Sequence, residues 1–152
     1  MKSYTIPLYT IRLVRDGNVK SHNVTIASPA DTHRVIAGML ADVDREQMLV
    51  ILLDTKNKMI GVQVAFVGTI NAINISMREL FKPAIVSSAA SIIIAHNHPS
   101  GDPTPSPEDV AVTRDIVAAG KLLDIIVLDH IIIGVGQYGE RFYSMNENGE
   151  GF

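Results

Sequence analysis

Residues 91–109 read SIIIAHNHPSGDPTPSPED, and this stretch decides the fold around it. Its first five residues are largely apolar and predict a buried β-strand, with His96 and His98 at the strand's end. Because side chains alternate between the two faces of a strand, both imidazoles point the same way and can bind one metal ion, whereas Asn97 faces away. The pair alone is a weak indication, since two histidines at this spacing also occur by chance on surface strands.

The residues after the histidines strengthen the interpretation as a metal site. Residues 99–105 are rich in proline and contain a glycine, so they form a stiff loop rather than a helix or a central strand. Ser106 and Asp109 then stand at the positions of a helix N-cap and of the acid three residues after it, with a proline between them. The loop therefore folds Asp109 back toward the histidines.

Two imidazole nitrogens and one carboxylate oxygen form a three-ligand set with a fourth position left for water. This number of protein ligands distinguishes catalytic zinc from closed structural zinc. The alternative is that Ser106 and Asp109 only cap a helix. Capping and ligation exclude each other only in part, because a carboxylate has two oxygens.

At this point the chain resembles a known family. The spacing of His96 and His98, followed after seven residues by Ser106 and Asp109, is that of the JAMM signature of JAB/MPN zinc peptidases. The string HNHPSGDP, with DHIIIG at residues 129–134, is closer still to RadC-like proteins. The resemblance covers about residues 44–144.

The resemblance implies a fold and a chemistry. The fold is α/β (α+β), with a central mixed β-sheet flanked by helices in the JAB/MPN, cytidine-deaminase-like architecture. In such proteins the two histidines and Asp109 hold Zn²⁺, Ser106 helps to stabilise the oxyanion, and an upstream glutamate acts on the zinc-bound water. The implied activity is that of a metallopeptidase hydrolysing a peptide or isopeptide amide bond, on a substrate that the sequence does not identify.

Two glutamates compete for the role of general base. Glu46 stands at the head of an apolar run of strand length, where the family's glutamate lies, and it is our choice. Glu79 is the rival, because MRELF at residues 77–81 also resembles a RadC-type motif. Ser76 and Glu79 can form a capping box, however, which explains Glu79 without chemistry. Arg78 and Glu79 remain candidate cleft residues.

Composition bounds the other function classes. A chain of 152 residues with 47% hydrophobic content predicts one domain with an ample core, and the lack of cysteine requires nitrogen and oxygen donors for any metal. RadC-like proteins carry a DNA-repair name, so a nucleic-acid-binding protein is one alternative. A net charge of −3 without a basic cluster disfavours nucleic-acid binding by this chain alone.

A non-catalytic JAB scaffold is the other alternative, although such relatives typically lose motif residues and all five candidates are present here. The letters HNH also occur in HNH nucleases, but nothing in the sequence shows the rest of such a site. The start lacks an apolar signal core, and no apolar stretch approaches the ~20 residues that span a bilayer, so we expect a cytoplasmic protein.

Patterns along the chain predict the remaining elements. Helices are expected to begin at Ser28, at Met77 and at Pro107. The expected strands are 46–53, 59–67, 92–98, 125–129, 131–134 and 138–145, with a further strand at 70–75. Residues 1–27 form an N-terminal extension, in which residues 6–26 predict a β-hairpin around Asp16-Gly17-Asn18, and residues 146–152 predict a frayed tail.

The pair Asp129 and His130 allows two interpretations. The two residues can together orient a metal ligand, as a carboxylate and an imidazole often do. Adjacent residues of a strand face opposite sides, however, which favours a purely structural role.

Overall fold

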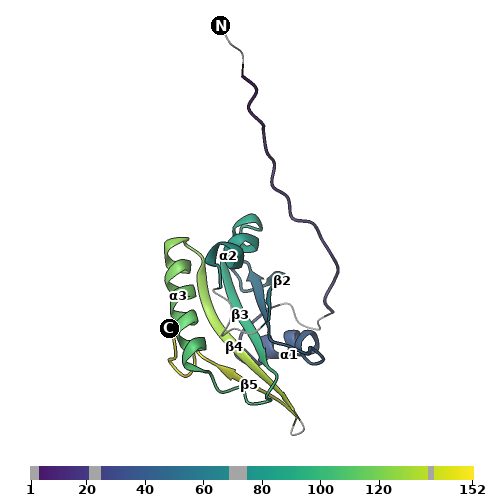
Figure 1. The fold of residues 1–152 in the computed structure, drawn as a ribbon, viewed down its shortest axis with the longest axis vertical. Coiled ribbons are helices and arrows are strands. Elements are labelled where there is room, and N and C mark those ends of the chain that lie inside the picture. The colour runs from purple at the N-terminus through teal and green to yellow at the C-terminus, as the bar shows by residue number, and fades with distance from the viewer. Residues whose placement is uncertain (1–3, 21–24, 69–74, 137–138) are drawn as a thin grey trace.

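The sheet at the centre of the molecule has helices on both of its faces (Figure 1). The structure is a computed structural model that describes residues 4–20, 25–68, 75–136 and 139–152. Its elements are α1 (Pro29–Leu40), β1 (Gln47–Leu53), β2 (Met59–Val67), α2 (Met77–Val86), β3 (Ser91–His98), α3 (Pro107–Leu122), β4 (Ile126–Gly136) and β5 (Gly139–Ser144). The five strands are ordered β2-β1-β3-β4-β5, and only β3 and β4 run parallel. The predicted mixed sheet flanked by helices is confirmed.

Two apolar cores cover the two faces of the sheet. On β3, Ile92 and Ile94 pack with residues of α2 and α3, whereas Ile93 and Ala95 pack with residues of α1. This division follows from the alternation of side chains along a strand that is buried on both faces. His96 continues the α2/α3 face, so the site forms between the sheet and α3.

The predicted helix starts at Ser28 and Ser106 are confirmed. Each serine caps its helix in a capping box with the aspartate three residues later. The capping box predicted for Ser76 and Glu79 is wrong, because the Ser76 side chain makes no capping hydrogen bond. The carboxylate of Glu79 instead pairs with Lys82 one turn later, at 2.7 Å.

Several element boundaries differ from the sequence predictions. β4 is one continuous strand, so the break expected at residue 130 is wrong. The tail at residues 146–152, predicted to be frayed, is tied to the sheet, since the N–H of Asn146 donates to Asp129 and the side chain of Asn148 donates to the carbonyl of Ser144. The additional strand expected at 70–75 falls almost wholly on residues 69–74, which lie outside the described residues.

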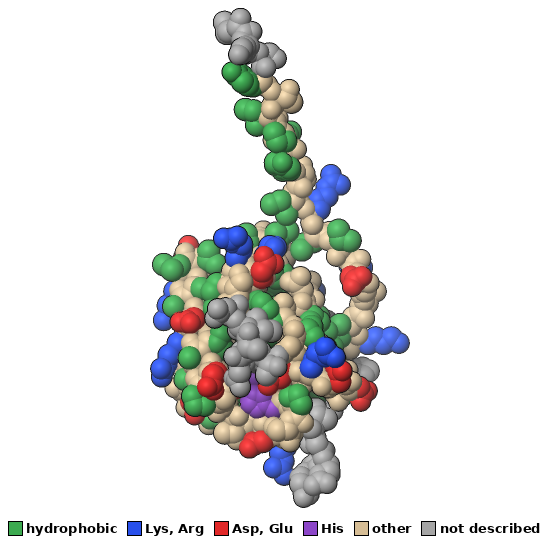
Figure 2. Space-filling model, in the orientation of Figure 1, with side chains coloured by type: hydrophobic (Ala, Val, Ile, Leu, Met, Phe, Trp, Pro, Cys, Tyr) green, Lys and Arg blue, Asp and Glu red, His purple; other side chains and the backbone are tan. Residues whose placement is uncertain are grey.

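The N-terminal segment differs most. Residues 4–20 belong to no strand and run away from the sheet with exposed side chains, many of them apolar (Figures 1 and 2). The predicted hairpin is therefore not formed by these residues, and part of its second arm, residues 21–24, lies outside the described residues. A two-stranded hairpin without further packing is only marginally stable, which explains the difference.

Within the described ranges, no helix combines the length and apolarity needed to cross a bilayer.

Candidate metal centre

The end of β3 and the start of α3 bring three potential metal ligands together. The Nε2 atoms of His96 and His98 are 2.9 Å apart, so the predicted common face of the two histidines is confirmed. Asp109 places Oδ1 3.2 Å from Nε2 of His96 and Oδ2 3.3 Å from Nε2 of His98. One ligand atom from each residue lies within 4.8 Å of the others, so the group can hold a metal ion.

These separations match a tetrahedral metal site. For Zn–N bonds of 2.0–2.1 Å, two corners of the tetrahedron are about 3.3 Å apart. His96 is inaccessible to solvent and Asp109 nearly so, whereas the side chain of His98 is 14% exposed. In Figure 2 histidine side chains reach the surface in the lower part of the molecule, with acidic side chains nearby. The site therefore opens to solvent on the side of His98.

Asp109 caps α3 and faces the histidines at the same time. Both the N–H and the hydroxyl of Ser106 donate to Oδ2 of Asp109 at 2.8 Å, and the N–H of Asp109 donates to the Ser106 hydroxyl at 3.1 Å. Oδ1 remains for His96. Capping and ligation are thus compatible, which the sequence alone had left open.

The loop between β3 and α3 is held in place by a glycine on β4. Gly134 pairs with His98 in the sheet, and a Cβ on Gly134 would stand 2.2 Å from the carbonyl oxygen of Gly101. Only glycine permits this approach. The loop in turn sets the carbonyl of Asp102 2.7 Å from Nδ1 of His98. Because a carbonyl only accepts, Nδ1 carries a proton, and in the neutral ring Nε2 has the lone pair that a metal requires.

The charges of the three residues suit metal binding. Burial alone would raise the pKa of Asp109, but the neighbouring imidazoles of His96 and His98 hold that pKa well below its usual value. Burial lowers the pKa of His96. Burial would also lower the pKa of His98, but its hydrogen bonds to Asp109 and to the carbonyl of Asp102 outweigh this and raise the pKa. A carboxylate and a neutral His96 are thus ready for ligation near neutral pH.

Glu46, the predicted general base, lies close enough to act electrostatically on the ligands. It directly precedes β1 and is half-buried. Its negative charge opposes the lowering of the His96 pKa by burial and adds to the other causes that raise the pKa of His98. β1 pairs with β3 so that Met48 is opposite His96, two residues from Glu46. The strand pairing therefore brings the head of β1 to the end of β3.

Asn97 fixes the backbone around Glu46, a contact that the sequence analysis missed. Asn97 is buried, and its Oδ1 accepts from the N–H of Gln47 at 2.8 Å while its Nδ2 donates to the carbonyl of Arg45 at 3.1 Å. The two bonds hold the chain on either side of Glu46. Asn97 faces away from the histidines, as predicted, but it connects their strand to the glutamate.

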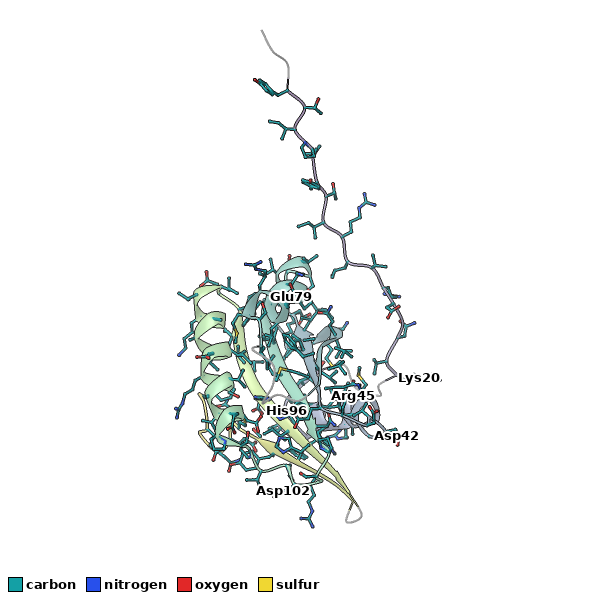
Figure 3. All side chains as sticks on the ribbon, viewed as in Figure 1. Lys20, Asp42, Arg45, Glu79, His96 and Asp102 are labelled. Carbon is teal, nitrogen blue, oxygen red and sulfur yellow. The ribbon has the colours of Figure 1, made fainter. Side chains whose placement is uncertain are left out.

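Arg78 and Glu79 are not brought to the site. Figure 3 shows Glu79 on α2, well separated from His96 in the view, while Arg45 and Asp102 lie nearer to His96. Both residues are exposed, and in the described part of the chain no hydrogen bond or ion pair joins either of them to the three ligands. The choice of Glu46 over Glu79 as the general base stays a prediction.

A third histidine contacts the ligand set. The Nε2 of His130 is 2.7 Å from Nδ1 of His96, and burial lowers the pKa of His130 well below its usual value. Asp129 faces the other way, where its carboxylate accepts from the Ser144 hydroxyl at 2.6 Å. The two residues thus do not act as a pair, but His130 alone reaches a ligand. The sequence allowed an orienting role for this pair but favoured a structural one, and the contact with His96 supports the orienting role for His130 only.

Comparisons with known proteins found one matching family profile and several similar proteins. The sequence profile of the RadC-like JAB domain matches residues 26–150. A UPF0758 protein of Roseiflexus castenholzii is 50% identical over 127 residues, which cover 84% of this chain and 53% of that protein. A UPF0758 protein of Methanosarcina mazei is 46% identical over 113 residues, which cover 74% of this chain and 49% of that protein.

The chain spans about half the length of the curated relatives it matches. The match includes the strand pair, the proline-rich loop and the helix start that form the metal centre. The chain belongs to the family of RadC-like JAB domains.

Proposed function

We propose that this domain is a Zn²⁺-dependent hydrolase that cleaves a peptide or isopeptide amide bond. The observation that carries the proposal is that His96, His98 and Asp109 each place one ligand atom within 4.8 Å of the others. Two neutral imidazoles and a carboxylate are a donor set that zinc accepts in catalytic sites. When bound there, zinc supplies a Lewis acid and lowers the pKa of a coordinated water.

Glu46 is assigned the proton transfers. A carboxylate in this position can accept the proton of the attacking water and deliver it to the leaving amine. This role needs a fixed position, which the two hydrogen bonds of Asn97 to the flanking backbone support. A half-buried Glu46 also remains accessible to water, as a base in a hydrolase must be.

Ser106 is assigned to the oxyanion. Its hydroxyl donates to Oδ2 of Asp109 at 2.8 Å, so it lies at the rim of the ligand set with its proton already turned toward the site. Rotation of this hydroxyl would direct the proton to a carbonyl oxygen of the substrate as negative charge develops there. The capping bond from the N–H of Asp109 keeps the oxygen itself in place.

The experiment compares two glutamate variants of the same chain. Glu46→Gln keeps the shape of the side chain but removes the base, so we expect zinc retention with hydrolysis reduced by ~10²-fold or more. Glu79→Gln is the matched control and should leave activity close to wild type. Activity is measured by mass spectrometry on peptide and isopeptide libraries with the zinc-loaded protein, with and without chelator.

The result also separates this proposal from its two alternatives. Chelator-sensitive cleavage that disappears in Glu46→Gln supports a hydrolase. One equivalent of zinc without cleavage of any library member would favour a scaffold that only binds partners. A larger loss of hydrolytic activity in Glu79→Gln than in Glu46→Gln would show that the choice of Glu46 as general base is wrong.

A further inference from the structure

His130 is a buried titratable residue that the proposed mechanism does not use. It is inaccessible to solvent and lies on β4, beside the strand that carries His96. Its Nε2 is 2.7 Å from Nδ1 of His96, and its Nδ1 is 2.6 Å from the hydroxyl oxygen of Thr113 on α3. Both ring nitrogens therefore have a polar partner, and neither partner is a carboxylate.

The direction of each hydrogen bond in this group follows from the number of protons. The Thr113 oxygen is also 2.6 Å from the backbone carbonyl of Asp109, which can only accept. Two oxygens at this distance need a proton between them, so the Thr113 hydroxyl donates to the carbonyl. The sulfur of Met145, 3.5 Å away, is a weaker acceptor, and donation to it would equally use the only proton of the hydroxyl.

With its own proton used, the Thr113 oxygen accepts a proton from Nδ1 of His130. A neutral imidazole carries one proton, so Nε2 of His130 has only a lone pair and must accept from Nδ1 of His96. A charged His130 would place a cation in a fully buried position without a carboxylate partner, which is costly. His96 thus keeps its proton on Nδ1, and its Nε2 is left free of a proton.

We propose that His130 and Thr113 are positioning residues that hold His96 in the tautomer whose Nε2 lone pair faces His98 and Asp109. The hydrogen-bond chain runs from the carbonyl of Asp109 to Nδ1 of His96, and the other ring nitrogen of His96 lies 3.2 Å from the carboxylate of the same Asp109. It links the first turn of α3 to β3 through β4. The relevance for metal binding rests on the proposed function, but the tautomer itself does not.

The two histidine ligands reach the same tautomer by different routes. His98 donates directly to a backbone carbonyl in an exposed loop, at 2.7 Å. His96 is fully buried, and its Nδ1 uses a second imidazole, that of His130, as acceptor. A neutral imidazole accepts at Nε2 only if its own Nδ1 is protonated. The hydroxyl oxygen of Thr113, which accepts from Nδ1 of His130, therefore determines the tautomer of His96.

The test is a pair of substitutions at Thr113. Thr113→Val keeps the shape and removes the hydroxyl, whereas Thr113→Ser keeps the hydroxyl and removes the methyl group. The proposal predicts that serine preserves the tautomer and valine disturbs it. A role in packing alone predicts the reverse order, because valine fills the space of threonine and serine leaves a gap.

The first measurement needs no metal. Long-range ¹H–¹⁵N correlation spectra of the metal-free protein identify which ring nitrogen of each histidine is protonated, with assignments from single histidine variants. We expect Nδ1 protonation of His96 and His130 in wild type and in Thr113→Ser, and a substantial Nε2-protonated population of His96 in Thr113→Val. Nε2 protonation of either histidine in wild type would overturn the proposal, even if the valine variant failed to fold.

The second measurement is zinc affinity by competition with a chromophoric chelator. Loss of an outer hydrogen-bond partner of a ligating histidine typically weakens metal binding by 10–100-fold, so we expect this for Thr113→Val and a change below about threefold for Thr113→Ser. Equal affinities of the valine variant and wild type would overturn the proposal. If wild type itself bound no zinc, the proposed function would fail, while the spectra would still decide the tautomer.

Discussion

Replacing Gly134 by alanine should damage the metal centre without changing any residue in it. The added Cβ would stand 2.2 Å from the carbonyl oxygen of Gly101, whereas ordinary contact begins at 3.4 Å, so the loop must move by about 1.2 Å. Asp102 follows Gly101, and a shift of this size is enough to break the 2.7 Å hydrogen bond between its carbonyl and His98. We expect a loss of about 1–3 kcal/mol in unfolding free energy and zinc binding weaker by about 10–100-fold.

The matched control is Gly61→Ala, a glycine-to-alanine change in β2. Its nearest neighbour would be Cδ1 of Leu52 at 3.5 Å, an ordinary contact. The assays are thermal denaturation, where 1 kcal/mol corresponds to about 2–4 °C in a domain of this size, and chelator competition for zinc. If Gly134→Ala and Gly61→Ala had the same thermal stability and the same affinity for zinc, the close approach of the loop to β4 would not be what positions His98.

Three further predictions follow from the site. His96→Ala, His98→Ala and Asp109→Ala should each lose zinc while keeping the fold, and full occupancy by elemental analysis in any two of them would contradict the ligand set. The pKa of His98 is raised, so at pH values below that pKa zinc must displace a proton from the ring. In that range we expect the apparent affinity for zinc to fall about tenfold for each unit that the pH is lowered, and above it the affinity should level off, as measured by chelator competition at several pH values. Duplex DNA should bind with a dissociation constant no lower than about 10⁻⁴ to 10⁻⁶ M at physiological salt, because the chain has only 13 basic residues against 16 acidic ones. Nanomolar, strongly salt-dependent binding in fluorescence anisotropy would point to a nucleic-acid function.

The parts of the site that depend on local sequence were predictable. Strand alternation placed His96 and His98 on one face, and the proline-rich loop before a capping signature returned Asp109 to them. Each inference uses residues within about a dozen positions of one another, where backbone geometry leaves few choices. The two capping boxes at Ser28 and Ser106 followed for the same reason.

Contacts that depend on strand order and register were not predictable. His130 reaches His96 because β3 and β4 are parallel with Ile94 opposite His130, and Asn97 reaches the backbone at residues 45–47 because β1 pairs with β3. These residues are 34 and about 50 positions apart in the chain. A sequence pattern can show that His130 is buried in a strand, but the neighbouring strand and its register are set by the packing of the whole sheet.

The spacing of the three side chains indicates which proton a bound metal ion would replace. Nε2 of His96 and the carboxylate of Asp109 are electron-rich atoms 3.2 Å apart, with Nε2 of His98 2.9 Å from the former, and such atoms repel unless a positive charge lies among them. A proton on Nε2 of His98 supplies that charge, in agreement with the raised pKa of His98.

These two pKa shifts determine how the stability of the fold depends on pH. Because the folded pKa of His98 is above its ordinary value of 6.5, the protonated ring contributes stability that is fully present below about pH 6.5 and is lost as pH rises through the folded value. Asp109 has a lowered pKa, so its contribution is present above about pH 3.8 and is lost only at more acid pH. Near neutrality the aspartate is thus always charged, and the proton on His98 is the one that a metal ion replaces. The same three side chains serve as a hydrogen-bonded cluster in acid and as a ligand set at higher pH.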